Sequence, residues 1–458
     1  MVMQPWSVAS EVLLYVGYNQ CAASYHQEII FMAENRLAVN NSLDALQEGG
    51  RVVIIGGGPG GTACALALDR LSAETGRRIE ITVIEGKQFT EERHYNQCVG
   101  VLSPPLPTLL EDQLGIPFPH ALCLVEIGGY ILHSPGEQIS LQGEKDGSIA
   151  VRRVQFDAYM LEQVKQRGIN VLPGRAVDLE FHDDRVMVYT ESEPAEADVV
   201  VGAFGLDEGS ASMFSRLTSY QPPRSLDSIV TKYEPEQGCV EEFGSDIYAY
   251  IPSHPRIEFG AITPKCGHLT INIAGISVDS DLMDLFLGNP AVQAVLPGFD
   301  SVNPSVPDHQ HFYKGRFPRS LAGNFYGDRY VMIGDAAGLV RAFKGKGATT
   351  AVLTGIRAAQ TIMESGISLQ AFHSHYRTAN QDIIGDLPYG RFMRLVAITI
   401  SRIGFLDAVL RAARDAPELR TALFDAVSGH GAYREIIGKS LRPNTIWAIL
   451  RALFQKGG

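Results

Sequence analysis

Cysteine is scarce in this 458-residue sequence, with six residues spread over positions 21, 64, 98, 123, 239 and 266. No two of them form a Cys-x-x-Cys pair, and no cluster of cysteines and histidines has the spacing of metal ligands. This scarcity argues against a disulfide framework and against a zinc site, and it favours reduced thiols in a cytosol. We therefore expect no bound metal and a cytoplasmic protein.

Positive charge and long apolar runs are also lacking. The 39 lysines and arginines are outnumbered by 51 acidic residues, which leaves a formal net charge of −12. Nucleic acids bind basic surfaces, so they are not expected as partners. No uninterrupted run of about 18 apolar residues occurs, so no membrane-spanning helix is predicted. No basic region precedes "SVASEVLLYVG", and Glu11 interrupts that stretch, so no signal peptide is predicted either.

The motifs of hydrolases and metalloproteases are missing as well. The sequence has no His-Glu-x-x-His motif, and His373 and His375 in "AFHSHYR" fit the polar face of a helix better than a metal pair. Glycine, in contrast, is abundant, with 46 residues. Two glycine-rich stretches, "VVIIGGGPGGTACALAL" and "GDAAGLVRAFKGKGATT", lie almost three hundred residues apart and raise the question of what both of them bind.

The first stretch predicts a strand, a turn and a helix. "RVVII" is typical of a buried strand, a helical pattern follows the glycines, and "RIEITVIEG" predicts a second strand that ends at Glu85. Gly56, Gly58 and Gly61 form Gly-x-Gly-x-x-Gly, which allows a tight turn, close approach of a pyrophosphate and close packing of the helix. A carboxylate at the end of the second strand can accept hydrogen bonds from a ribose. The motif predicts a dinucleotide site without separating FAD from NAD.

The second stretch, "YVMIGDAAG", places Asp335 directly after a strand, among small residues that let the backbone approach a ligand. Its carboxylate can bond a ribityl hydroxyl. A helix that begins near Gly347 would point its N-terminus at the flavin ring, where the reduced flavin carries negative charge. NAD(H) alone would need no second clamp, so the two stretches together predict FAD held at both ends.

The pattern of elements predicts an α/β protein in which an antiparallel sheet is inserted into a Rossmann-like FAD-binding domain, with a helical C-terminal region. The predicted parts are an N-terminal helical extension (1–48), a discontinuous FAD-binding domain (49–220 and 321–365), a substrate-binding β-sheet domain (221–320) and a C-terminal helical region (366–458).

These motifs resemble the FAD-dependent superfamily of aromatic hydroxylases of the p-hydroxybenzoate hydroxylase type, flavin-dependent halogenases and geranylgeranyl reductases. "RRVQFDAYMLEQ" is similar to the Arg-x-x-Phe-Asp segment of the superfamily, with Arg153 as the arginine near the FAD. "NQCVGVLSPPL" is similar to the Cys-x-Gly-x-x-Ser-Pro segment of geranylgeranyl reductases, which runs beside the flavin and the prenyl substrate. "YAYIP" at 248–252 loosely resembles the strand that lines the substrate cavity in that branch, although it is one residue shorter.

The chain departs from the superfamily pattern at three positions. Phe204 stands where an aspartate usually helps to handle the pyrophosphate and NADPH, and Asp207 is the nearby candidate to substitute for it. Ala342 replaces a common proline. Lys346 lies between two glycines, where its ammonium would raise the reduction potential of the flavin by favouring the anionic hydroquinone, unless it is a solvated loop residue.

The resemblance implies an FAD-dependent oxidoreductase that reduces C=C bonds of an isoprenoid or other lipid-like substrate, with NAD(P)H or a reduced ferredoxin-like protein as electron donor. Two alternatives stay open. One is a flavin monooxygenase or halogenase that acts on an aromatic or polyketide-like substrate, although the halogenase tryptophan motif is missing. The other is a non-catalytic flavin-binding protein. The oligomeric state is left open.

Three sets of residues follow as candidates. The candidate catalytic residues are Cys98, Tyr95 and Lys346, with His94 nearby and with packing as the alternative role of Cys98. Tyr248, Tyr250 and Pro252 are expected to line the substrate cavity, unless the tyrosines belong to the core of a strand. The residues expected to bind FAD are Gly56, Gly58, Pro59, Gly60, Gly61, Glu85, Gly86, Gln97, Cys98, Val99, Arg153, Val177, Gly334, Asp335, Gly345, Lys346, Gly347 and Ala348.

Two apolar helices edged with basic residues are predicted in "FMRLVAITISRIGFLDAVLRAARD" and in "LRPNTIWAILRALFQKGG". This pattern is typical of helices that lie on a membrane surface, and helices that complete the core of a protein share it. Peripheral membrane contact would help an enzyme to collect an isoprenoid substrate.

Overall fold

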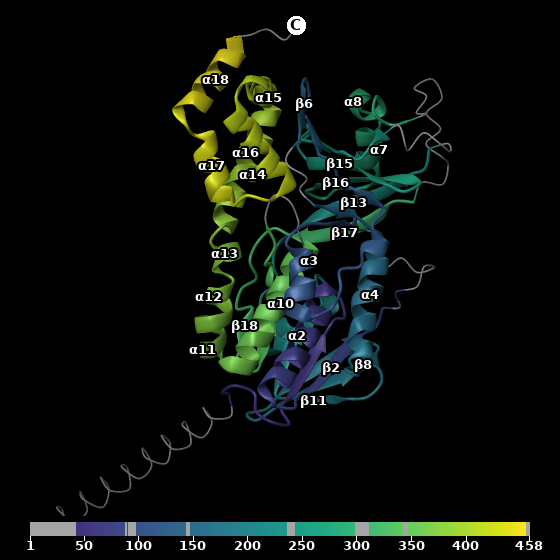
Figure 1. The fold of residues 1–458 in the computed structure, drawn as a ribbon, viewed down its shortest axis with the longest axis vertical. Helices are drawn as coiled ribbons and strands as arrows, with labels where there is room; N and C mark the ends of the chain where they lie inside the picture. Colours follow the sequence, from purple (N-terminus) through teal and green to yellow (C-terminus); the bar gives the residue numbers. More distant parts are fainter. Residues whose placement is uncertain are drawn as a thin grey trace, which may run out of the picture.

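The computed structural model describes residues 43–87, 89, 98–142, 147–235, 243–297, 311–341 and 347–454. Figure 1 shows two sheets one above the other along the long axis, with the C-terminal helices, coloured olive to yellow, running along one side of both. Residues 1–42 of the expected N-terminal extension lie outside the described residues, and the segment that follows them is joined to the molecule by a hydrogen bond from the Leu46 backbone N–H to the carbonyl of Ile362 (3.0 Å).

The first sheet has six strands in the described part of the chain. Val-rich and Ile-rich runs form its central strands, as expected for parallel strands that are buried on both faces. β1 is central and pairs in parallel with β2 and β12, while the edge strand β18 is antiparallel to β19. In spatial order the strands are β18 (Tyr326–Gly327), β19 (Tyr330–Met332), β12 (Val199–Gly202), β1 (Arg51–Ile55), β2 (Glu80–Glu85) and β8 (Asn170–Pro173).

Helices and a small sheet complete the core around these six strands. Helix α2 (Pro59–Thr75) packs against α10 (Gly347–Glu364) and α4 (Arg153–Gln166). A three-stranded sheet contributes to the same core, with α5 packed on β9; its elements are β9 (Ala176–Phe181), β10 (Val186–Thr190), β11 (Ala195–Ala197) and α5 (Glu208–Leu217).

The second sheet has seven described strands and is antiparallel except where β14 pairs in parallel with β5. Two of its strands, β5 and β6, precede α4 in the chain, so the expected boundaries of 221–320 leave them out. No local pattern signals this contact, because it joins segments more than a hundred residues apart. In spatial order the strands are β17 (Tyr313–Pro318), β13 (Ser225–Tyr233), β16 (His268–Gly275), β15 (Ile257–Lys265), β14 (Ile247–Tyr250), β5 (Tyr130–His133) and β6 (Gln138–Leu141).

The two faces of the seven-stranded sheet differ in chemistry. One face packs on α7 (Ser280–Leu287) and α8 (Pro290–Gln293) in an apolar core that includes Ile262 and Phe286. On the other face, β5, β6 and β14 pack on the C-terminal helices. The remaining part of that face carries the buried polar side chains Thr263, Lys265, Thr270 and Asn272.

The C-terminal helices follow α10 and reach the seven-stranded sheet. Arg394 of α14 forms an ion pair with Glu258 of β15 (3.2 Å), and Ser401 Oγ donates to the carbonyl of Ile251 (2.7 Å). The helices are α11 (Leu369–Ala371), a π-helix (Phe372–Tyr376), α12 (Arg377–Ala379), α13 (Gln381–Ile384), α14 (Leu387–Arg402), α15 (Phe405–Asp415), α16 (Pro417–Ser428), α17 (Tyr433–Ser440) and α18 (Pro443–Phe454). The short elements elsewhere are β3 (Val101–Leu102), α3 (Leu106–Thr108), a π-helix (Leu109–Gln113), a 3₁₀-helix (His120–Leu122), β4 (Val125–Glu126), β7 (Ile149–Ala150) and α9 (Gly334–Ala337). The predicted fold class, with its inserted sheet and helical C-terminal region, is confirmed.

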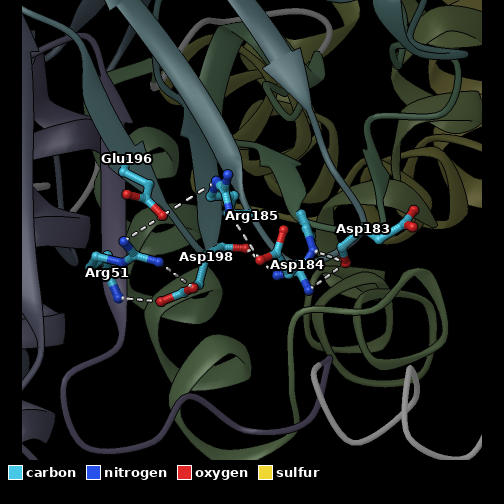
Figure 2. A network of polar contacts seen from close by, with 7 residues as sticks. Arg51, Asp183, Asp184, Arg185, Glu196 and Asp198 are labelled. Atoms are coloured by element: carbon cyan, nitrogen blue, oxygen red, sulfur yellow. Dashed lines mark hydrogen bonds and ion pairs between the residues drawn. The ribbon is translucent and has the colours of Figure 1, made fainter.

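A polar network joins the amino ends of the six-stranded sheet (Figure 2). Arg51 at the start of β1 pairs with Glu196 (2.8 Å), and its backbone N–H donates to the carboxylate of Asp198 (2.7 Å). Arg329, just before β19, donates to the backbone carbonyls of Asp198 (3.0 Å) and Asp183 (2.9 Å). Ligands of such sheets bind at the carboxyl ends of the strands, so this network has a structural role.

Candidate functional site

The turn between β1 and α2 has the geometry of a phosphate cradle. Gly56 has φ of +111°, and a Cβ there would lie 2.5 Å from the carbonyl oxygen of Ala203. A Cβ on Gly61 would lie 1.9 Å from the carbonyl oxygen of Gly56, so both positions need glycine for the protein itself. Around Gly58, in contrast, a Cβ would meet no atom of the described chain within 4 Å. No side chain caps the N-terminus of α2, so its N–H groups face an open space beside Gly58.

Glu85 lies beside this turn, at the carboxyl end of β2. Its Oε2 accepts a hydrogen bond from the backbone N–H of Gly57 (2.8 Å), and its Oε1 accepts one from Lys87 (2.7 Å). A carboxylate has about four acceptor sites, so it keeps capacity for ribose hydroxyls. Pro59 begins α2, Gly60 packs against Ala351 of α10, and Gly86 lies against Gly174 and Arg175. Val177 on β9 is 55% exposed.

The second glycine-rich stretch converges on the same side of the sheet. Gly334 has φ of +55°, and its N–H donates to Thr354 Oγ1 of α10 (3.0 Å). A Cβ on Gly347 would lie 3.9 Å from Oδ1 of Asp335, which places this carboxylate at the N-terminus of α10. Ala348 is buried in the first turn of α10. Within the described ranges no donor binds the Asp335 side chain. Burial raises the pKa of Asp335, and Arg153 partly offsets this effect.

Arg153 links the two halves of the candidate site. It is the first residue of α4, and its Nε lies 2.7 Å from Oδ1 of Asp157, one turn further along the helix. Burial opposes its charge, but Asp157, Cys98 and Asp335 together hold the pKa of Arg153 above its ordinary value. The structure therefore brings Cys98, Arg153 and Asp335 into one electrostatic environment, although they lie far apart in the sequence.

Lys265 is the functional candidate that sequence reasoning missed. It ends β15 with only 4% of its surface exposed, and its Nζ donates to the backbone carbonyl of Val151 (2.9 Å). A Cβ on Gly100 would lie 2.9 Å from the same Nζ. Burial lowers the pKa of Lys265 to about 8. The neighbouring charges of Lys232 and Arg152 lower this pKa further, whereas Cys98 raises it. The sequence carried no signal, because a lysine at a strand end is usually solvated.

The polar face around Lys265 also holds two buried side-chain atoms that have no hydrogen-bond partner among the described residues. Lys265 pairs in register with His268, and Thr263 pairs with Thr270. The pKa of His268 is lowered to about 4, by burial first and then by Lys265, so its ring is neutral at pH 7. Thr263 Oγ1 and, further along the same face, Asn272 Oδ1 are buried without a hydrogen-bond partner in the described structure. Buried polar atoms normally have partners, so this face is suited to a polar ligand group.

Tyr250 is buried in the apolar core beneath α7 and α8, and Tyr248 is half-buried against the same core. Tyr250 packs against Phe286 (ring centroids 5.4 Å apart) and His133 (4.5 Å), and its hydroxyl donates to the carbonyl of Ala291 (3.3 Å). Both tyrosines project to the face of the sheet that carries α7 and α8, away from the face of Lys265, because side chains alternate along a strand. Pro252 is half-buried just beyond this strand.

Some of the remaining residues that the sequence suggested for the site lie in the described part of the chain, and others lie outside it. Cys98 is exposed, its sulfur accepts a hydrogen bond from the backbone N–H of Gly100 (3.5 Å), and Val99 is half-buried. Phe204 stacks on Phe214 (5.6 Å). Asp207, the suggested substitute for the missing aspartate, caps α5 by accepting from the backbone of Ser210 (2.8 Å). The residues that lie outside the described part of the chain are His94, Tyr95, Gln97, Ala342, Gly345 and Lys346.

Comparison with curated proteins finds two plant reductases at low identity. The chain is 23% identical over 363 residues to a chloroplastic geranylgeranyl diphosphate reductase of Nicotiana tabacum, which covers 72% of this chain and 70% of the relative. It is 25% identical over 347 residues to the enzyme of the same name in Arabidopsis thaliana, with coverage of 69% and 66%. No family model matches the sequence.

Solved structures share the overall fold of this chain. A flavoprotein/dehydrogenase from Cytophaga hutchinsonii has a TM-score of 0.63 at 17% identity, covering 89% of this chain and 100% of that one. The chain has the fold of an FAD-dependent flavoprotein. A geranylgeranyl bacteriochlorophyll reductase-like protein from Thermoplasma acidophilum has a TM-score of 0.61 at 16% identity, with coverage of 86% and 99%. A flavin-dependent brominase follows with a TM-score of 0.59 at 17% identity, with coverage of 85% and 98%.

These similarities confirm the resemblance to the flavoprotein superfamily that the motifs indicated. The residues of the candidate site fit FAD, because an open space beside Gly58, an uncapped N-terminus of α2 and the acceptor Asp335 are what a long dinucleotide requires. In the described segments no cluster of three or more histidine, cysteine or acidic residues could hold a metal ion.

Proposed function

We propose that this protein reduces C=C bonds in an isoprenoid or similar lipid chain that ends in an anionic group. The coarser statement, an FAD-dependent oxidoreductase, is supported by the fold and by the two curated relatives. One observation carries the finer proposal: the buried Lys265 beside the Cys98–Gly100 segment, on a polar face with no carboxylate paired to it among the described residues. The electron donor, NAD(P)H or a ferredoxin-like protein, and the cytoplasmic location stay predictions.

The residues of the glycine turns would hold the cofactor. The N–H groups of α2 and the open backbone at Gly58 would receive the pyrophosphate, and Glu85 would accept hydrogen bonds from a ribose. Asp335 would accept from the ribityl chain, and the N-terminus of α10 would stabilise negative charge on the ring. Bound FAD, once reduced by the electron donor, would supply the hydride. Arg153 would keep the adjoining region positive and orient Asp335.

The polar face would hold the anionic end of the substrate. Lys265, Lys232 and Arg152 raise the local electrostatic potential, as the mutual effects on the pKa of Lys265 indicate. An anion bound there would remove the free-energy penalty of burying an uncompensated ammonium. Thr263 would donate from its free hydroxyl. The names of the curated relatives refer to a diphosphate, which is an anion of this kind. The chain of the substrate would then run past Cys98, which stays the candidate proton donor.

The proposed reaction is tested with the purified holoprotein. Its flavin is reduced under anaerobic conditions and then mixed with geranylgeranyl diphosphate, and flavin absorbance and product mass are followed. We expect reoxidation of the flavin and a product that gains two hydrogen atoms for each reduced bond. A monooxygenase or halogenase would instead need oxygen and would leave the prenyl chain unchanged. A flavin that responds to neither the lipid nor oxygen would indicate a binding protein and would overturn the proposal.

A further inference from the structure

Exposed apolar side chains are concentrated on two C-terminal helices. Seventeen large hydrophobic side chains of the described chain are exposed, and eleven of them lie between Tyr389 and Phe454. The other six are scattered singly over the molecule, which is normal for a soluble domain. The concentrated set on α14 and α18 therefore calls for a physical explanation; its main members are Tyr389, Phe392, Leu395, Trp447, Leu450 and Phe454.

Helix α14 presents these residues as a stripe. Its exposed apolar residues recur at intervals of three and four, as in Tyr389, Phe392, Leu395 and Val396, while Ile398 on the other side is buried. Phe392 is 57% and Leu395 is 64% exposed. Arg391 and Arg402 of this helix are exposed, whereas Arg394 is paired with Glu258, and Leu387–Arg402 contains no acidic residue.

Helix α18 repeats the arrangement. Trp447, Leu450 and Phe454 follow one another at intervals of three and four, and Trp447 is 71% and Phe454 89% exposed. Thr445 and Ala452 form the buried side. Arg451 is the single charged residue of Pro443–Phe454, and again no acid is present.

The core of the protein does not account for these stripes. Both α14 and α18 pack against α15. Their opposite sides already supply side chains to the core beneath the seven-stranded sheet, such as Ile400 and Ala452. Each helix therefore has a buried side that completes the core and, separately, an exposed apolar stripe that the core does not use. No described helix is long and apolar enough to cross a membrane. With 16 and 12 residues, these helices suit the plane of a membrane surface.

Charge decides between the possible occupants of this surface. The protein as a whole has a net charge of −12, yet α14 and α18 carry arginines and no acid. A second copy docked face to face would bring like charges together, whereas anionic lipid head groups complement them. Trp447 and Phe454 are of the residue types that insert at the boundary between head groups and acyl chains. We propose that α14 and α18 form a docking surface for an anionic membrane, whatever the substrate of the enzyme is.

The experiment uses the full-length holoprotein and flotation with two kinds of vesicle, one of phosphatidylcholine alone and one containing phosphatidylglycerol. We expect the wild-type protein to float with the anionic vesicles and to be released by high salt. The variants Phe392→Glu/Leu395→Glu and Trp447→Glu/Phe454→Glu should each lower binding at least about tenfold, because they remove inserted apolar area and add negative charge. Leu285→Glu on α7, which is 55% exposed away from these helices, is the matched control and should bind like the wild type.

Several outcomes would overturn the proposal. These are a wild-type protein that stays with the buffer, equal binding to both kinds of vesicle, and equal loss of binding in the Leu285→Glu control. If sedimentation shows that the wild type is a dimer and the stripe variants are monomers, the surface is an interface between copies. If the wild type fails to bind but a chain lacking residues 1–42 binds, the N-terminal segment is the occupant. Flavin absorbance and the melting temperature of each variant show that the fold is intact, independently of substrate turnover.

Discussion

Nζ of Lys265 donates a 2.9 Å hydrogen bond to the backbone carbonyl of Val151, and this contact joins the seven-stranded sheet to the segment between β7 and α4. The partner is a neutral carbonyl, so it does not compensate the charge of the ammonium. Lys232 and Arg152 add repulsion instead of relief. Keeping Lys265 charged in the folded protein therefore lowers the free energy of unfolding. Measurements on Lys265 variants can reveal this cost.

Replacing Lys265 by methionine should change how stability depends on pH. The pKa of Lys265 falls from 10.5 to about 8 on folding, so between these values the unfolded chain binds more protons than the folded one. The free energy of unfolding of the wild type should therefore rise from pH 8 to pH 10.5 by about 3 kcal/mol more than that of Lys265→Met. Urea unfolding at both pH values measures this difference. The exposed Lys314→Met on β17 is the control, and equal pH dependence in all three proteins would contradict the prediction.

The same substitution should weaken binding of an anionic substrate. Lys265→Met removes the buried cation, so KM for geranylgeranyl diphosphate should rise about tenfold or more, since charge-assisted hydrogen bonds contribute about 1.5–3 kcal/mol. KM for the uncharged alcohol geranylgeraniol should change little. Steady-state kinetics with both substrates separates the two effects. A similar rise for both would show that Lys265 acts only on the shape of the site.

Gly58 offers a test of the phosphate cradle that leaves the protein undisturbed. Gly58→Val places its Cβ where no atom of the described protein lies within 4 Å, at an ordinary φ of −71°. The melting temperature of the apoprotein should stay nearly constant, while FAD affinity should fall at least about tenfold because the backbone can no longer approach the pyrophosphate. Gly315→Val, in equally open space on β17, should leave both quantities unchanged. Titration with FAD measures the affinity, and thermal denaturation measures the melting temperature. If Gly58→Val binds FAD as tightly as the wild type does, the cofactor does not bind at this turn.

Asp335→Asn should act on the apoprotein and on the cofactor complex in opposite directions. Burial raises the pKa of Asp335, so the neutral amide should leave the apoprotein equally or more stable. FAD affinity should fall by about tenfold, because an ionised acceptor is lost. Denaturation with and without FAD measures both effects. Loss of stability in the apoprotein alone would show that the carboxylate serves the fold and not the flavin.

Tyr250 should behave as a core residue. Tyr250→Ala should lower the free energy of unfolding by about 3–5 kcal/mol, as for other large buried aromatic residues. Tyr250→Phe removes the hydrogen bond to the Ala291 carbonyl and should cost about 1 kcal/mol. KM of Tyr250→Phe should equal that of the wild type. A changed KM with unchanged stability would restore the role in the substrate cavity that the sequence suggested.

The motifs that the sequence predicted are those in which a few neighbouring residues determine the geometry. Gly56, Gly58 and Gly61 with Glu85 belong to one local strand–turn–helix unit, and Asp335 belongs to another. Lys265 could not be found in this way, since its burial results from contact with Val151, more than a hundred residues away.

The tyrosines of β14 show a different limit. Strand alternation correctly places Tyr248 and Tyr250 on one face of a sheet, but both faces of the seven-stranded sheet are buried, one by α7 and α8 and the other largely by the C-terminal helices. Hydrophobicity therefore cannot tell which face meets the site. The parallel pairing of β5 with β14 is hidden for a similar reason, because it depends on the arrangement of distant segments.

The order of the strands has a consequence during translation. β1 lies between β2 and β12, β19 lies beyond β12, and α10 packs on α2. A nascent chain that has emerged only as far as the glycine turn lacks every later strand that flanks it, and the cofactor cradle cannot close until about three hundred more residues have left the ribosome. Such long-range pairing makes folding slow and leaves unfinished strand edges exposed. Truncation before α10 should thus yield aggregating chains that depend on chaperones, and not a smaller working enzyme.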